Sequence, residues 1–250
     1  LHGPYGEDGT IQGLFEMINL KYVGSGVLAS AVSMDKSFAK PIFASAGLKV
    51  APGIVVTSSN FQLPADLKFP LFVKPARSGS SRGTTKVKSE AELKNAVAFA
   101  LEFDTKVLIE SAINGREIEC AVLQSAGKII ASPVGQIVID SKYEFYDFQA
   151  KYLDNSMQLV FPTDLSAGVE AKIQEQAITA FNAAGCEGLA RVDFFYTNDG
   201  EIIINEINTM PGFTPLSVYP KLIAKTGVDY KELISKLIES ALNRSANITR

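Results

Sequence analysis

Residues 191–212 read Arg-Val-Asp-Phe-Phe-Tyr-Thr-Asn-Asp-Gly-Glu-Ile-Ile-Ile-Asn-Glu-Ile-Asn-Thr-Met-Pro-Gly. Two runs of β-branched and aromatic residues flank Asn-Asp-Gly, and this pattern predicts a β-hairpin. Pairing across the turn places Tyr196 opposite Glu201, and therefore Arg191 opposite Glu206.

The predicted hairpin separates polar from apolar side chains, because successive residues of a strand point to opposite faces. One face carries Arg191, Asp193, Glu206 and Asn208, and the other carries Val192, Phe194, Ile203 and Ile207. Two carboxylates, an amide oxygen and a guanidinium suit Mg²⁺ beside an anionic substrate. A surface hairpin with ordinary ion pairs is the alternative. Apolar residues on both sides of the motif favour partial burial, where unpaired charge is costly.

The composition is that of a globular protein with a substantial core. Of the residues, 46% are hydrophobic and 20% are charged, as is usual for globular proteins. A length of 250 residues is enough for two lobes. A net charge of -3 gives no electrostatic reason to expect nucleic acid. There is no apolar run of roughly 18 residues and no signal-peptide pattern. We therefore expect a cytoplasmic protein that does not bind a membrane.

Cysteine and histidine usage excludes several classes of site. Cys120 and Cys186 are isolated from each other and from any histidine, so neither a disulfide framework nor a zinc site is predicted. His2 is the single histidine and cannot form a histidine metal cluster by itself. Because the chain begins at Leu1 inside a glycine-rich motif, we expect it to be part of a longer protein.

Three glycine-rich loops could approach a ligand. Residues 2–10 open a helix, although a plain turn with a cap is the alternative. Residues 24–29 match Gly-x-Gly-x-x-Ala, but no acidic residue ends the next expected strand, which argues against a dinucleotide site. Residues 77–83 lack the Walker A ending. This third loop still offers N–H and hydroxyl donors to phosphates, and Lys74 beside it argues against a flexible surface hairpin.

Periodicity and turn residues predict an alternation of helices and strands. Helices are expected at 11–18, 36–46, 90–103 and 167–184, with further helices ending near 243, and strands at 53–56, 69–74, 84–87, 106–110, 116–123 and 128–139. Ser89 and Glu92 form a predicted capping box. Residues 140–161 are expected to be a long irregular loop, a length that is typical of lids and binding loops.

Taken in order, the motifs resemble those of D-alanine–D-alanine ligases, a family of the ATP-grasp superfamily. They are His2-Gly-x-x-Gly-Glu-Asp-Gly9, Gly24-Ser-Gly26, Met34-Asp-Lys36, Phe72-Val-Lys-Pro75, Gly79-Ser-Ser81, Tyr146-Asp147, Lys151-Tyr152, Arg191-Val-Asp193 and Asn205-Glu-Ile-Asn-Thr-Met-Pro-Gly212. Each motif is modest alone, but their order and spacing are specific and extend over essentially the whole chain.

The resemblance implies an α+β protein with the ATP-grasp fold, in which two α+β lobes clamp ATP. It implies a remnant of an α/β N-terminal substrate-binding domain at 1–25, a central lobe at 26–110 and a C-terminal lobe with the metal site at 111–250. The implied activity is ATP-dependent joining of two D-alanines through an acyl phosphate, for peptidoglycan precursors and the cell wall.

Nucleotide and metal roles also follow from the resemblance. It implies that Lys36, Lys74 and Lys151 contact the phosphates and that Ser81 also binds the nucleotide. The backbone around Glu110 and Ile113 would hold adenine, and Glu117 would bind the ribose. Asp193, Glu206 and Asn208 would bind two Mg²⁺ ions, for which Mn²⁺ can substitute.

The resemblance further implies the residues of the chemical step. Arg191 and the N–H of Gly212 would stabilise the oxyanion, and Ser80 would hydrogen-bond Tyr152 as two loops close and exclude water. His2, Ser217 and Val218 would bind D-alanine, with Ser217 at the acceptor carboxylate.

Residues 146–152 bear on the second substrate. This stretch contains no histidine and resembles the dipeptide-forming version of the loop, which favours an amine over the hydroxyl of D-lactate. The alternatives are a D-alanine–D-lactate ligase, another ATP-grasp carboxylate–amine ligase and a non-catalytic nucleotide-binding module. The family suggests a homodimer. Its first domain has a glycine-rich start and a glutamate that would precede Leu1, so we expect the isolated chain to bind ATP but ligate poorly.

Overall fold

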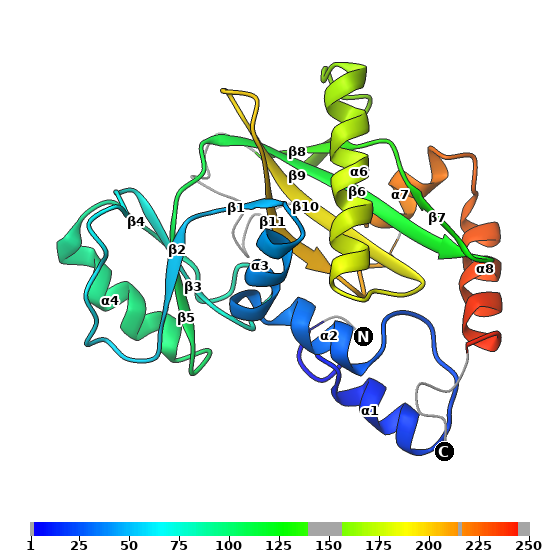
Figure 1. The fold of residues 1–250 in the computed structure, drawn as a ribbon, viewed down its shortest axis with the longest axis horizontal. Coiled ribbons are helices and arrows are strands. Elements are labelled where there is room, and N and C mark those ends of the chain that lie inside the picture. Colours follow the sequence, from blue (N-terminus) through cyan, green and yellow to red (C-terminus); the bar gives the residue numbers. More distant parts are fainter. Residues whose placement is uncertain (1–2, 140–156, 215–216, 245–250) are drawn as a thin grey trace.

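The computed structural model describes residues 3–139, 157–214 and 217–244. Two β-sheets of unequal size, each with its own helices, make up the molecule (Figure 1). The larger sheet has seven strands and the smaller sheet has four. Among the helices of these ranges, none has the length and apolar character needed to cross a membrane.

Most predicted elements are confirmed within a few residues. The helices are α1 (Thr10–Met17), α2 (Val27–Met34), α3 (Lys36–Ser45), α4 (Glu90–Leu101), α6 (Ala167–Ala183), α7 (Val218–Ala224) and α8 (Tyr230–Leu242). The strands are β1 (Lys49–Val50), β2 (Gly53–Val56), β3 (Leu71–Pro75), β4 (Thr85–Val87), β5 (Val107–Ser111), β6 (Gly115–Ser125), β7 (Lys128–Ala131), β8 (Gly135–Ile139), β9 (Met157–Val160), β10 (Leu189–Thr197) and β11 (Ile202–Asn208).

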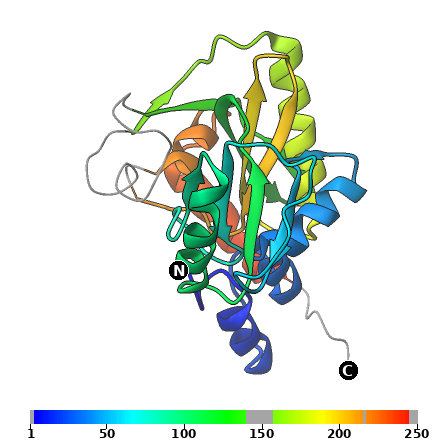
Figure 2. The same cartoon turned by 90° about the vertical axis from the view of Figure 1, so that its left-hand side faces the viewer.

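The smaller sheet has the order β2-β5-β3-β4, and α4 covers one of its faces. Alternation along β3 buries Leu71 and Val73 in the core with α4. The intervening Phe72 and Lys74 therefore point to the opposite face. Figure 2 shows this small sheet in front of the larger one.

The larger sheet has the order β1-β11-β10-β6-β8-β9, with β7 beside β6. Helices α3 and α6 pack Phe43 and Phe181 on one face, and α7 and α8 pack Tyr219 and Leu233 on the other. Strand β1 pairs with β11, so both β1 and α3 pack with the larger sheet. The predicted domain division at residue 110 stays a prediction.

The predicted register of the hairpin β10–β11 is wrong. The turn closes with the Thr197 N–H donating to Glu201 O at 2.9 Å, so Tyr196 lies opposite Ile202 rather than Glu201. A β-bulge then shifts the register again, and Arg191 lies opposite Asn208 instead of Glu206. The turn geometry sets the first shift, and the extra residue of the bulge sets the second.

The two shifts together preserve the predicted polar face. Asp193 lies opposite Glu206, so Arg191, Asp193, Glu206 and Asn208 share one face, as predicted. Ile203 lies opposite Phe195 and so faces the polar side, contrary to prediction. Ile202 and Ile204 join the core instead, because the shift at the turn places them opposite Tyr196 and Phe194. The bulge between Ile204 and Glu206 then returns Glu206 and Asn208 to the polar face.

Two local predictions need correction. Residues 157–160 form β9, which pairs with β8, although an irregular loop was expected there. Ser89 makes no side-chain cap; its hydroxyl donates to Glu92, whose carboxylate also accepts from the Lys88 N–H. The Met34-Asp-Lys36 motif lies at a junction of two helices, because Asp35 ends α2 and caps α3 through the Ser37 N–H.

Candidate active site

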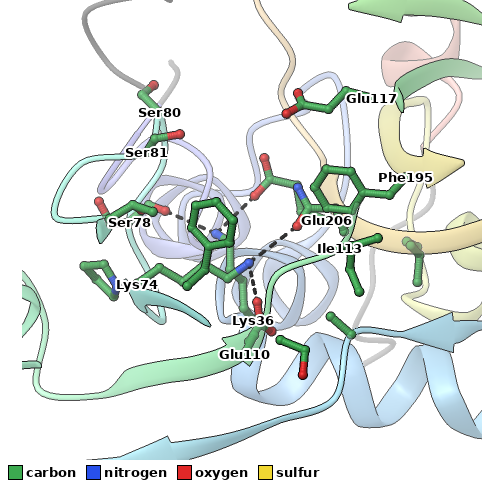
Figure 3. Close-up of a pocket in the computed structure, with 17 residues that line it drawn as sticks. Lys36, Lys74, Ser78, Ser80, Ser81, Glu110, Ile113, Glu117, Phe195 and Glu206 are labelled. Carbon is green, nitrogen blue, oxygen red and sulfur yellow. Dashed lines mark hydrogen bonds and ion pairs between the residues drawn. The ribbon is translucent and has the colours of Figure 1, made fainter. Parts of the chain in front are cut away.

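A cleft lies between the open face of the smaller sheet and the strands β10 and β11 (Figure 3). Its lining includes eight of the predicted site residues: Lys36, Lys74, Ser80, Ser81, Glu110, Ile113, Glu117 and Glu206. Phe72, Ile113 and Phe195 add apolar surface, beside the carboxylate of Glu117. The cleft therefore combines apolar walls with a floor of charged groups.

Lysines and carboxylates alternate along the floor of the cleft. Lys36 Nζ lies 3.1 Å from Glu206 Oε2 and donates to Ser78 O, also at 3.1 Å. Lys74 Nζ lies 2.5 Å from Glu110 Oε2 and 3.4 Å from Asn205 Oδ1. Figure 3 shows both ammonium groups pointing into this charged region. Cations at these positions can bind an anionic ligand such as a polyphosphate.

Glu110 is the most deeply buried charge of the floor, with 3% of the residue exposed. Burial tends to raise the pKa of its carboxyl, but Lys74 and Lys40 outweigh that effect and hold the pKa below its ordinary value. For Lys40 the balance is reversed, because burial outweighs the attraction of Glu110 and lowers the pKa to about 8.

The loop over the cleft has a strained backbone. Ser80 and Ser81 have φ angles of 55° and 57°, in the left-handed region that side chains disfavour. Such residues cost about 1–3 kcal/mol each and concentrate at ligand sites. A Cβ on Gly83 would lie 2.8 Å from Pro75 Cγ, so glycine is needed where the loop returns along β3.

A second charged cluster lies on the polar face of the hairpin. Arg191 Nε and Nη2 donate to the two oxygens of Asp193 at 2.8 and 2.7 Å. The same Nε lies 3.0 Å from Glu119 Oε2. Burial acts to lower the pKa of Arg191, but Asp193 and Glu119 outweigh it and raise the pKa well above its ordinary value. The guanidinium is thus permanently charged and oriented by two carboxylates.

The three carboxylates of this region form a row across the sheet. Asp193 lies opposite Glu119 of β6 on one side and Glu206 of β11 on the other. Asn208 donates its amide N–H to Asp193 Oδ2 at 3.0 Å. Oxygen ligands of this kind fit Mg²⁺. Within the described ranges, no group of three or more acidic, cysteine or histidine side chains is arranged so that it could hold a metal ion.

The remaining predicted residues that the structure describes do not line the cleft. Gly212 follows the hairpin, and a Cβ there would lie 2.8 Å from Ser217 Oγ, so a larger residue would force the Ser217 hydroxyl to move. Ser217 Oγ accepts from the Thr214 N–H at 2.9 Å. Val218, the first residue of α7, is buried beneath them. His2, Lys151 and Tyr152 lie outside the described residues.

Sequence reasoning missed four residues around the site: Phe72, Phe195, Lys40 and Glu119. Two of them had a visible signal. Lys40 follows Lys36 by one helical turn, which places both on one face of α3. Glu119 follows Glu117 by two residues in β6 and therefore points to the same side of the sheet.

Comparison with known proteins agrees with this geometry. The family model described as D-ala D-ala ligase C-terminus matches residues 42–239, and the one described as D-ala D-ala ligase N-terminus matches residues 1–25. The D-alanine--D-alanine ligase of Pseudarthrobacter chlorophenolicus is 53% identical over 260 residues, which cover 99% of this chain and 68% of that relative. The Streptomyces coelicolor enzyme of the same name is 48% identical, with 99% and 67% covered.

Solved structures of ligases are also similar to this chain. The VanG D-Ala:D-Ser ligase from Enterococcus faecalis superposes with a TM-score of 0.87 at 42% identity, over 95% of this chain and 70% of that one. The D-alanine--D-alanine ligase from Bacillus anthracis complexed with ATP superposes with a TM-score of 0.80 at 32% identity, over 97% of this chain and 77% of that one. This chain therefore belongs to the D-alanine–D-alanine ligase family, and its two lobes have the ATP-grasp fold.

Proposed function

We propose that the protein binds Mg·ATP in the cleft and joins two D-alanines to D-alanyl-D-alanine for peptidoglycan synthesis. One observation supports this above all: a lysine-rich cleft floor leads directly into a carboxylate row that contains an oriented guanidinium. The relatives named D-alanine--D-alanine ligase and the B. anthracis complex with ATP support the same assignment.

The nucleotide would lie along the cleft with its phosphates over the charged floor. Lys36 and Lys74 would exchange part of their contact with carboxylates for phosphate oxygens, and Ser81 would add a hydroxyl donor. The base would lie between the apolar walls near Glu110 and Ile113. Glu117 would accept hydrogen bonds from the ribose hydroxyls. Lys151 would contribute a further cation.

Asp193, Glu206 and Asn208 would hold the metal ions beside the phosphates. When bound, Mg²⁺ or Mn²⁺ would neutralise charge that develops on the transferring phosphoryl group. The chain itself prepares this site, since Arg191 and the Asn208 amide hold the carboxylate of Asp193 in place.

The chemistry would proceed in two steps. The carboxylate of the first D-alanine attacks the γ-phosphorus of ATP. ADP departs as the leaving group, and the product is an acyl phosphate. The amine of the second D-alanine then attacks the carbonyl carbon, and phosphate leaves. Arg191 and the Gly212 N–H would stabilise the oxyanion of that second step. Ser217 would orient the acceptor carboxylate beside Val218, and His2 would assist in binding the first D-alanine.

Closure over the cleft would protect the acyl phosphate from water. Ser80 would hydrogen-bond Tyr152 in the closed state, and the strained backbone at Ser80 and Ser81 supports a role for that loop. We also propose a homodimer, which sedimentation velocity would test by its mass.

The decisive experiment supplies Mg·ATP and D-alanine to the full-length protein and measures phosphate release together with dipeptide mass. D-serine and D-lactate should be offered as competing acceptors. We expect D-alanyl-D-alanine with one phosphate per bond formed. Glu206→Gln should abolish turnover, whereas Glu201→Gln, on the exposed end of the same hairpin, should not. ATP binding without any ligated product would refute the assignment.

A further inference from the structure

Glu110 is held between two lysines that come from different elements. Its Oε1 pairs with Lys40 of α3, and its Oε2 lies 2.5 Å from Lys74 Nζ of β3. Only 4% of the Glu110 side chain and 10% of the Lys40 side chain are exposed. Lys74 lines the cleft, whereas Lys40 does not. Lys40 can therefore influence a ligand in the cleft through Glu110.

The fold makes room for this arrangement at Gly53. In the β2–β5 pair Gly53 lies opposite Glu110. A Cβ on Gly53 would lie 2.9 Å from Glu110 Cγ and 2.6 Å from Ile109 O. Lys40 also approaches Ala51 O, at 3.5 Å. The absence of a side chain at Gly53, together with the backbone at Ala51, thus leaves space for the Glu110 and Lys40 side chains to pair.

We propose that Lys40 is a positioning residue of the nucleotide site, which acts through Glu110 on Lys74. The identity of the ligand as a nucleoside triphosphate rests on the function proposed above. By binding one oxygen of Glu110, Lys40 prevents that carboxylate from neutralising Lys74 alone. The buried group of three then carries one net positive charge, which the cleft offers to the phosphates.

The cost of burying Lys40 supports a specific role. Burial lowers its pKa to about 8, and the charged groups that face it are Glu110, Lys74 and Lys36. Two of these groups are cations, which disfavour a third ammonium. An apolar residue would avoid this cost. Charge at this position therefore requires a reason beyond packing, and the positive charge that it leaves on Lys74 for the phosphates provides one.

Calorimetric titration with Mg·ATP tests the proposal. Lys40→Met should weaken binding about tenfold, because Glu110 then neutralises Lys74. Lys94→Met removes the same charge from an exposed site on α4 and should leave the dissociation constant unchanged. Thermal unfolding of both variants identifies any loss of fold. A folded Lys40→Met protein with wild-type affinity would overturn the proposal.

A double-mutant cycle tests whether Lys40 acts through Glu110. If it does, Lys40→Met should cost less affinity in the Glu110→Gln background than in the wild type. Equal losses in both backgrounds would overturn the proposed route. Wild-type protein that binds Mg·ATP but makes no dipeptide would refute only the proposed function. Unchanged affinity of Lys40→Met in an active enzyme would refute only this inference.

Discussion

The two charged clusters of the site have inverse compositions. At the cleft floor one carboxylate, Glu110, lies between Lys74, which lines the cleft, and Lys40, which lies behind it and does not. On the hairpin one cation, Arg191, lies between the two carboxylates Glu119 and Asp193. Both groups are largely buried, and in each the central residue bonds both of its neighbours.

This inversion gives the two ends of the site opposite net charge. The floor retains a positive charge, which suits phosphates, and the hairpin retains a negative charge, which suits a divalent cation. Because both central charges are neutralised locally, neither cluster leaves an isolated charge in a low-dielectric interior. The comparison indicates that each cluster suits a ligand whose charge is opposite to its own net charge. Four substitutions can test this interpretation.

Arg191→Met should have the largest effect. Loss of the oxyanion donor should reduce turnover on the order of a thousandfold, which is about 4 kcal/mol. Mn²⁺ binding, measured by electron paramagnetic resonance with ADP present, should not weaken. Asp193 loses one of the groups that orient it, but the Asn208 amide still donates to it, and removal of the neighbouring positive charge strengthens its attraction for the metal. Arg116→Met, which removes the pair with exposed Asp164, is the control. Weaker Mn²⁺ binding in Arg191→Met would contradict the inversion.

Glu119→Gln should have the next largest effect. The side chain keeps its size but loses the charge that orients Arg191 at 3.0 Å. We expect turnover about tenfold lower and a loss of about 2 kcal/mol in the free energy of unfolding. Steady-state kinetics and urea unfolding measure the two quantities. Turnover equal to wild type would mean that Asp193 alone orients Arg191.

Gly53→Ala should disturb the floor without changing any charge. The added methyl would lie 2.6 Å from Ile109 O and 2.9 Å from Glu110 Cγ, so β5 must shift at Glu110 and the pairing of Glu110 with Lys40 is disturbed. A loss of about 1–2 kcal/mol in unfolding free energy is expected from such overpacking, with weaker Mg·ATP binding. Gly168→Ala is the matched control, because nothing lies within 4 Å of its added Cβ. Unchanged nucleotide affinity in folded Gly53→Ala would argue against a role of the Glu110–Lys40 pair in nucleotide binding.

Glu110→Gln should lower the free energy of unfolding near neutral pH, and its difference from wild type should shrink on acidification. The pKa of Glu110 lies below its ordinary value of 4.5 in the folded protein. Its ionised form therefore stabilises the fold above pH 4.5, and this contribution is lost as the pH falls through the folded pKa. Urea unfolding from neutral to acidic pH should show a steeper loss of stability in wild type than in the variant. If the unfolding free energies of wild type and variant fell in parallel with pH, the lowered pKa of Glu110 would be contradicted.

The sequence allowed the composition of the hairpin site to be predicted but not its register. Alternation along a strand is local, so Arg191 and Asp193 share a face whatever lies opposite them. The turn at Thr197–Gly200 and the bulge before Glu206 depend on how the two strands fit together. Ile203 was misplaced for that reason, although the polar face was correct.

Motif lysines were also predictable, whereas their partners were not. Lys36 and Lys74 belong to recognisable motifs, and the structure places both in the cleft. Their pairing with Glu206 and Glu110 joins elements that are distant in the chain. Lys40 and Glu119 belong to no quoted motif, and only their contacts indicate a role. The assignments of Lys151, Tyr152 and His2 stay predictions.

By itself, the sequence determined the family, the order of the elements and the residue types that face the site, because motif spacing and strand alternation are properties of short segments. Only the tertiary structure decided which cation neutralises which carboxylate. That outcome depends on burial and on approaches of a few ångströms between α3, β3, β5, β6 and the hairpin. Ionic interactions weaken with distance and with solvent exposure, so their strength is set once the chain has folded.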